Sequence, residues 1–152
     1  MKKFLALVLS CFAIVASNAQ PTSEEEALQM MITRMFEAMN KSEGHILERC
    51  FSEDAILETL YTKDGEKKIH RTSAKDFIEQ VSLPRKEDWK EQINGWTIHI
   101  DGDLASIWTP YTFYLDGEIS HCGINSFQLR NTNKEGWKIT YVIDTRRREG
   151  CD

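Results

Sequence analysis

Histidine and cysteine stand side by side at positions 121 and 122, in the stretch "ISHCGINSFQLR" that runs from Ile119 to Arg130. Thiol hydrolases use this pair of side chains as base and nucleophile, provided that the two can form a hydrogen bond. The stretch has the alternating pattern of a β-strand, in which successive side chains point to opposite faces of the sheet. His121 and Cys122 therefore cannot point at each other, and the sequence argues against a thiol nucleophile.

The strand pairing around this stretch decides which side chains share a face with His121. Asp116-Gly117 is the kind of turn that joins two antiparallel strands directly. For Ile107 and Phe127 to lie opposite each other, as the apolar pattern requires, one strand must carry an extra residue. We expect this β-bulge near Thr109-Pro110, because proline cannot donate to the strand ladder and is tolerated at a bulge.

The inward face that results is mostly apolar, with a few polar side chains that a ligand could contact. His121 is the candidate catalytic residue, because a neutral imidazole can hydrogen-bond a ligand or act as a base near neutral pH. The alternative is a core histidine whose hydrogen bond is satisfied by Thr112. Asn125 and Tyr141 are open to the same two interpretations. The predicted ligand-binding set is completed by Thr112, Tyr114, Trp96 and Glu58.

Helices come first in the chain and strands follow. Ser23, with an acidic run directly after it, predicts a helix start, and apolar residues from Leu28 to Met39 recur at three and four, which predicts one buried helix face. Shorter helices are expected over 45–50 and 73–81. Strands are expected over 56–61 and 67–71 as a hairpin, then over 92–100, 104–115, 119–130 and 137–144 as an antiparallel meander. Helices segregated from such a sheet define an α+β domain.

The first nineteen residues are typical of a secretion signal. Two lysines precede an apolar run from Phe4 to Ala16, and Ser17 and Ala19 occupy the minus-three and minus-one places of a signal-peptidase site. We therefore expect cleavage after Ala19, a secreted or periplasmic protein, and a single domain over residues 20–152. Cleavage with lipidation at Cys11 is the alternative, although it would leave a short apolar core for an export signal.

Charge and cysteine content narrow the possible partners. The formal net charge is −5 and basic residues are scattered except at Arg146–Arg148, so no nucleic-acid partner is expected. That basic run is either a solvated strand end or an anion clamp at the pocket mouth. No later segment has the apolar length of a membrane span, and no cysteine spacing suggests a metal or a cofactor. Cys50 and Cys122 are either buried apolar residues, or Cys122 pairs with Cys151 in a disulfide.

Three segments then give the sequence a family resemblance. "GDLASIW", "HCGINSFQL" and "GWKITYVIDTRR", in this order after the helices and "FSEDA", resemble the nuclear-transport-factor-two-like superfamily. "DGEISHCGINSFQLRNTNKEGWKI" is similar to its exported SnoaL-like, or lumazine-binding-like, branch. The resemblance implies a cone-shaped barrel, in which a curved antiparallel sheet wraps around N-terminal helices and encloses a pocket. It also implies a homodimer formed through the convex sheet face.

These observations support three hypotheses for the function. The leading one is an exported protein that binds a small cyclic or partly aromatic compound in its pocket, without demonstrated catalysis. The second is an isomerase, dehydratase or cyclase that uses His121 as its general base. The third is an interaction module whose cavity is filled by its own side chains. One fold accommodates all three, so the fold alone cannot choose among them.

Overall fold

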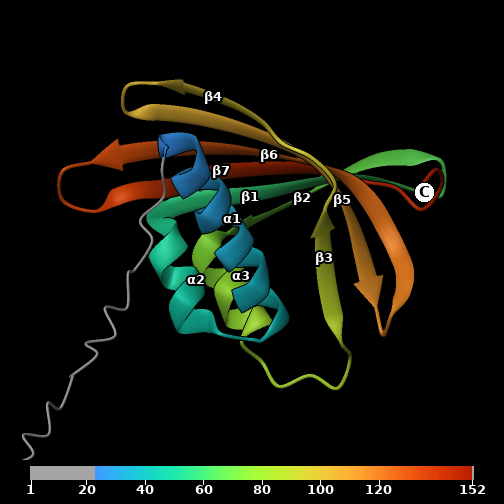
Figure 1. Ribbon diagram of the computed structural model, residues 1–152. Helices are drawn as coiled ribbons and strands as arrows, with labels where there is room; N and C mark the ends of the chain where they lie inside the picture. The colour runs from blue at the N-terminus through green and yellow to red at the C-terminus, as the bar shows by residue number, and fades with distance from the viewer. Residues whose placement is uncertain (1–22, 152) are drawn as a thin grey trace, which may run out of the picture.

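Three helices lie against one side of a seven-stranded curved sheet (Figure 1). The computed structural model describes residues 23–151, so the expected signal segment lies outside the described residues. The elements in chain order are α1 (Glu24–Asn40), α2 (Gly44–Cys50), β1 (Phe51–Lys63), β2 (Glu66–Ser73), α3 (Ala74–Val81), β3 (Trp89–Ile93), β4 (Thr97–Asp101), β5 (Leu104–Leu115), β6 (Glu118–Thr132) and β7 (Gly136–Arg146).

The helix starts follow the sequence signals closely. The Ser23 hydroxyl accepts a hydrogen bond from the Glu26 amide, and the Ser73 hydroxyl accepts one from the Asp76 amide, so each serine caps its helix. The predicted apolar face of α1 is buried, including Leu28 and Ile32, which are fully inaccessible. Each such side chain contributes roughly 1.5–3 kcal/mol when it leaves water.

The strand order is β2-β1-β7-β6-β5-β3, with β4 paired to another part of β5. The predicted α+β class and the curved sheet around the helices are confirmed. Three details differ from the prediction. The sheet is mixed, because β1 runs parallel to β7, and it is open, since β2 and β3 end the path. The expected strand over 92–100 is in fact two strands, β3 and β4, separated at Asn94–Trp96.

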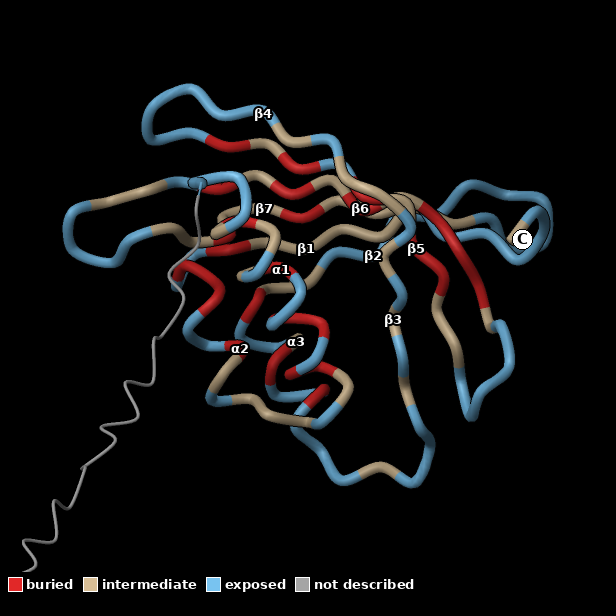
Figure 2. The backbone as a smooth tube through the Cα atoms, in the orientation of Figure 1, coloured by how far each residue is buried: buried red, intermediate tan, exposed pale blue. Residues whose placement is uncertain are grey.

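The core lies between the helices and the concave face of the sheet. Phe36 of α1 meets Phe127 of β6 edge to face, with ring centroids 6.0 Å apart, and Ile107, Leu129 and Ile139 are fully buried around them. Figure 2 shows that the buried residues concentrate in the helices and in the middle of the strands above them. The far end of the β5–β6 hairpin curls past the helices together with β3 (Figure 1), so this end of the concave face is not covered by helices.

Candidate functional site

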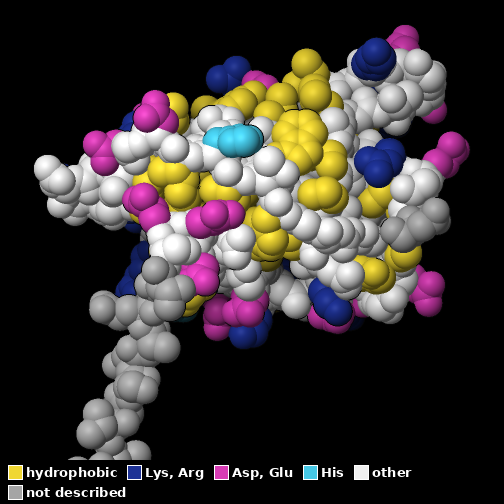
Figure 3. All heavy atoms as spheres, turned by 45° about the horizontal axis from the view of Figure 1, so that its top comes forward, with side chains coloured by type: hydrophobic (Ala, Val, Ile, Leu, Met, Phe, Trp, Pro, Cys, Tyr) yellow, Lys and Arg dark blue, Asp and Glu magenta, His cyan; other side chains and the backbone are white. Residues whose placement is uncertain are grey.

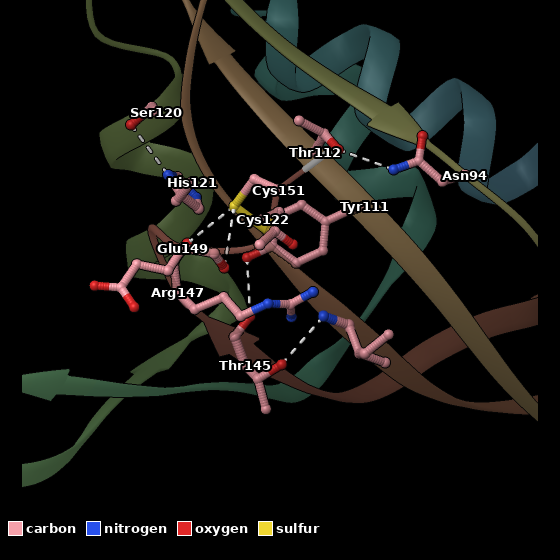
Figure 4. Close-up of a disulfide and its surroundings, with 12 residues drawn as sticks. Asn94, Tyr111, Thr112, Ser120, His121, Cys122, Thr145, Arg147, Glu149 and Cys151 are labelled. Atoms are coloured by element: carbon pink, nitrogen blue, oxygen red, sulfur yellow. Dashed lines mark hydrogen bonds between the residues drawn. A yellow bond between two sulfur atoms is a disulfide. The ribbon is translucent and has the colours of Figure 1, made fainter.

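The alternation of β6 separates His121 from Cys122, as the sequence predicts. Asn125 and Phe127 share the concave face with His121, while Cys122 lies on the opposite side of the strand. Cys122 forms a disulfide with Cys151, with Cα atoms 5.4 Å apart (Figure 4). Its sulfur is therefore no free thiolate, which removes the nucleophile independently of the geometry. The other cysteine in the described residues, Cys50, is free and buried, and burial raises the pKa of its thiol.

A bulge between β5 and β6 exists, but not at Thr109-Pro110. Ile107 pairs with Phe127 as predicted, and the register shift comes later, between Phe113 and Tyr114, where Ser120 is the extra residue. The position of the bulge matters because the part of β5 between the predicted bulge and the observed one pairs with β6 one residue away from the predicted register. Phe113, and not Thr112, is therefore the residue opposite His121.

Thr112 and Tyr114 consequently point away from the concave face, and their predicted inward orientation is wrong. Thr112 is paired with Cys122, and its hydroxyl accepts a hydrogen bond from the Asn94 side-chain amide at 2.9 Å. The Tyr114 ring lies under the ammonium group of Lys90, which is 5.8 Å from the ring centroid. Thr112 cannot satisfy the imidazole of His121 from this position.

His121 is instead held by aromatic neighbours. Its ring stacks on Phe113 at 4.7 Å between centroids, and Tyr111 approaches it edge-on at 5.9 Å. Its Nδ1 atom lies 3.1 Å from the Ser120 hydroxyl (Figure 4). Burial, helped by the positive charges of Arg146 and Arg148, lowers the pKa of His121 to about 4. The imidazole is therefore neutral at physiological pH and a weak base.

Tyr141 and Glu58 lie together, but on the outer face of the sheet. A second irregularity, between Gln128 and Leu129, leaves Ile139 and Val142 in the core and turns Tyr141 outward. Its hydroxyl donates to a Glu58 carboxylate oxygen at 2.6 Å, and this hydrogen bond raises the pKa of Tyr141. Arg71 forms an ion pair with the same carboxylate at 3.1 Å. The predicted inward position of Tyr141 is wrong for this reason.

The concave face carries a carboxylate pair that the sequence reasoning missed. Glu91 of β3 accepts a hydrogen bond from the side-chain amide of Asn125 at 2.7 Å. Burial raises the pKa of Glu91 to about 8; the Asn125 hydrogen bond acts in the opposite sense and the nearby charge of Asp144 in the same sense. Glu91 is therefore largely protonated at neutral pH, which makes it able to donate as well as accept hydrogen bonds.

Asp144 is the second carboxylate. Its Oδ1 atom accepts a hydrogen bond from the Thr59 hydroxyl at 2.6 Å. Its Oδ2 atom accepts one from the Tyr111 hydroxyl at 3.3 Å. Burial raises the pKa of Asp144, and burial together with both carboxylates raises the pKa of Tyr111. The guanidinium of Arg146 is the positive charge of this group and favours the ionised form of each acid. We call Glu91, Asp144, Tyr111, Arg146 and Asn125 the polar cluster.

Gly123 makes room for the polar cluster. A Cβ atom at this position would lie 1.7 Å from the carbonyl oxygen of Thr145 and 2.9 Å from the ring of Tyr111. The same carbonyl oxygen accepts a hydrogen bond from the Tyr111 hydroxyl at 3.1 Å. Only glycine allows the end of β7 to come this close to β6, so Gly123 places Asp144 and Arg146 beside Tyr111.

A hollow of about 440 Å³ between α1 and β3 reaches this cluster. Its apolar wall includes Phe36, Ile93 and Trp96, and its polar wall includes Thr33, Asn40 and Glu91. Of the predicted ligand-binding residues, Trp96 lines this hollow. The Oδ1 atom of Asn40 is buried and finds no hydrogen-bond partner among the described residues. Glu91 is the residue that connects the hollow to the polar cluster.

Sequence reasoning missed Glu91, Asp144 and Tyr111 for one shared reason. Each is visible in the sequence as a polar group within an apolar strand pattern, in "WKEQI", "YVIDT" and "TPYTF". Their inward orientation depends on the two bulges and on the break between β3 and β4, which the sequence placed wrongly or not at all. Among the described residues, no group of three or more His, Cys, Asp or Glu side chains could hold a metal ion.

Comparison with known proteins shows the fold. No protein-family model matches the sequence, and no curated protein matches it significantly. An NTF2-like protein from Cytophaga hutchinsonii superposes with a TM-score of 0.66 at 12% identity, over 83% of this chain and 100% of that one. A nuclear transport factor 2-like superfamily protein from Salmonella enterica superposes with a TM-score of 0.64 at 13% identity, over 83% of this chain and 92% of that one. An NTF2-like protein of unknown function from Shewanella baltica superposes with a TM-score of 0.61 at 18% identity, over 87% of this chain and 100% of that one.

Proposed function

We propose that this chain, which has the fold of the nuclear transport factor 2-like proteins, binds a small cyclic or partly aromatic compound at the concave end of its sheet. The hollow beside Glu91 is the supporting observation: it combines apolar and aromatic walls with a few polar groups, the composition of small-molecule sites in general. Its volume of about 440 Å³ lies in the range that such ligands occupy.

The polar cluster is the part that would select the ligand. Glu91 lines the hollow and is largely protonated, so it presents one acid hydrogen to a ligand there, while the side-chain amide of Asn125 holds the other side of the carboxyl group in place. A buried carboxyl group of this kind matches a ring carbonyl or ring nitrogen that accepts a hydrogen bond. A ligand without such an acceptor would leave the acid group unpaired, which is unfavourable in a desolvated site.

A thermal-shift screen of cyclic and heterocyclic compounds tests this proposal, because a ligand that prefers the folded state raises the unfolding temperature. A hit should lose its effect in the Asn125→Ala variant and keep it in Glu79→Gln, which changes an exposed carboxylate on α3. If no compound in a broad panel stabilises the chain, the third hypothesis, an interaction module with a filled core, gains instead.

Proton-transfer catalysis is a second candidate, and the raised pKa of Glu91 favours it. The imidazole of His121, with its pKa lowered to about 4, is a poor general base at neutral pH. A carboxyl group with a pKa of about 8 is a much better one, since its basic form is strong and accessible near neutrality. An isomerase or dehydratase of this kind should therefore lose turnover in Glu91→Gln and retain most of it in His121→Gln. The reverse result would restore His121 as the base.

The outer face of the sheet supports the proposal of a homodimer. Trp108 is 51% exposed there, on β5, and Leu104 on the same strand is 56% exposed. Figure 3 shows apolar side chains gathered over this face, with the charged ones mostly around its margin. Patches of this kind mark interfaces. Light scattering should find a dimer that Trp108→Lys disrupts, while Leu83→Lys, at an equally exposed leucine after α3, leaves it intact.

Export and the SnoaL-like branch are part of the same proposal. The basic and apolar N-terminal segment supports export, and the Cys122–Cys151 disulfide supports it further, because disulfides persist in oxidising compartments. No helix in residues 23–151 has the length and apolar character of a membrane span. Mass spectrometry of the protein recovered from its host gives the N-terminus, and cleavage after Ala19 is the expected result.

A further inference from the structure

Two of the three consecutive arginines near the C-terminus, Arg147 and Arg148, follow β7 in a loop that is closed at both ends on Cys122. Arg147 forms two backbone hydrogen bonds with Cys122, each 2.9 Å long. Four residues later the disulfide brings Cys151 back to the same Cys122 (Figure 4). Gly150, with a φ of 63°, takes the left-handed conformation that this reversal needs. We call residues 147–151 the arginine loop.

The hairpin between β1 and β2 lies beside the arginine loop (Figure 1). Tyr61 pairs with Arg146 across the parallel β1–β7 ladder, which fixes the distance between the two segments. Between them is a pocket of about 1030 Å³, and it is distinct from the hollow beside Glu91. Its lining residues are mostly of charged or polar type and come from two segments, Tyr61–Asp64 and Arg146–Gly150.

The residues that line this pocket carry a net positive charge. Four cationic side chains line it, those of Lys63 and Arg146–Arg148, against the two carboxylates of Asp64 and Glu149. None of the ion pairs within residues 23–151 involves any of these four cations. Arg146 faces Tyr111 and the polar cluster, which leaves the guanidinium groups of Arg147 and Arg148 as the available ones.

We propose that the arginine loop and the β1–β2 hairpin form a binding site for a small molecule that carries an oxyanion group, either a phosphate or a carboxylate. Guanidinium groups bind both through paired N–H donors in a planar fork. The hydroxyl groups of Tyr61 and Thr62 add neutral donors on the opposite wall. The disulfide orders the backbone of the loop before the ligand arrives, which reduces the entropy lost on binding.

Amide-detected NMR titration of the disulfide-bonded chain at low ionic strength tests the site directly. The probes are inorganic phosphate, acetate and glucose 6-phosphate, with glucose as the uncharged control. Saturable shifts are expected at Lys63, Arg147 and Arg148 with the anions and not with glucose. A tighter response to phosphate than to acetate identifies the phosphate arm, and the converse identifies the carboxylate arm. If no anion moves these resonances, the proposal is overturned.

Two variants separate a site from general electrostatic attraction. Arg147→Gln with Arg148→Gln should weaken binding at least tenfold, because it removes charge-assisted hydrogen bonds. Lys41→Gln with Lys86→Gln makes the same change in net charge at two exposed lysines elsewhere, and should change binding less than about twofold. Equal losses in the two double variants would show that the chain attracts anions only through its overall charge.

The role of the disulfide is tested by Cys151→Ser, which opens the arginine loop and keeps all its cations. The anion affinity should fall by about tenfold as the loop loses its fixed shape. An unchanged affinity would overturn the part of the proposal that assigns ordering to the disulfide. These readouts are independent of the hollow beside Glu91, because a ligand there shifts β3 and α1 and leaves the hairpin resonances in place.

Discussion

Replacing Glu91 by glutamine should change how stability depends on pH, because the carboxyl group has a pKa of about 8 in the folded chain and an ordinary one of 4.5 when unfolded. The folded state therefore binds the proton more tightly than the unfolded state. The stability that this bound proton adds to the folded state is fully present below about pH 4.5 and is lost as the pH rises through about 8. Glutamine imitates the protonated acid, and its side-chain oxygen can still accept the Asn125 hydrogen bond.

The size of the effect follows from linkage. Each unit of pH within this window changes the free energy of unfolding by up to about 1.4 kcal/mol for one proton. Between pH 5.5 and 7.5 the wild-type chain should thus lose up to roughly 2.7 kcal/mol relative to Glu91→Gln. We expect about half of this value, since the side chain retains some contact with solvent and Asp144 titrates with it.

Urea denaturation of both chains across this pH range measures the difference. Groups such as His121 titrate in both chains, so their contribution cancels in the comparison. Glu79→Gln is the matched control, because it removes an exposed carboxylate and should run parallel to the wild type. Parallel curves for wild type and Glu91→Gln would refute the buried, protonated state of Glu91 on which the proposed ligand selection depends.

Three further predictions concern the residues that hold the site in place. NMR titration should show the imidazole of His121 protonating only near pH 4, whereas an inflection near 6.5 would mean that it is not buried against Phe113. Gly123→Ala should destabilise the chain by about 3 kcal/mol or more, because the added methyl group clashes with the Thr145 carbonyl. Urea denaturation measures this loss, and a stability within about 0.5 kcal/mol of wild type would contradict the close approach of the two strands. Arg85→Ala should lower the free energy of unfolding by about 2–4 kcal/mol, because the Arg85 guanidinium donates to carbonyl groups at the ends of α1 and α3 and stacks on Trp89. Lys86→Ala, at the exposed neighbouring residue, should lower it by less than about 0.5 kcal/mol. Equal losses in urea denaturation of the two variants would refute the role of Arg85.

The sequence by itself determined most of the helices and strands, although not the break between β3 and β4, and several local features. Serine caps, the apolar period of α1 and the Asp-Gly turns depend on residues within a few positions of one another, so the sequence pattern records them directly. The separation of His121 from Cys122 is equally local, because it follows from the alternation of a single strand. The pairing of Cys122 with Cys151 was one of two interpretations, and the structure selects it.

Only the tertiary structure decided which polar side chains meet. A bulge shifts every later side chain to the other face, and its position depends on packing between strands that the sequence pattern does not resolve. This is why Thr112, Tyr114 and Tyr141, which the strand pattern predicts to face inward, lie outward in the fold. Asp144 lies 53 positions from Glu91 in the sequence, and its charge raises the pKa of Glu91 only because β3 and β7 converge on the same concave end of the sheet.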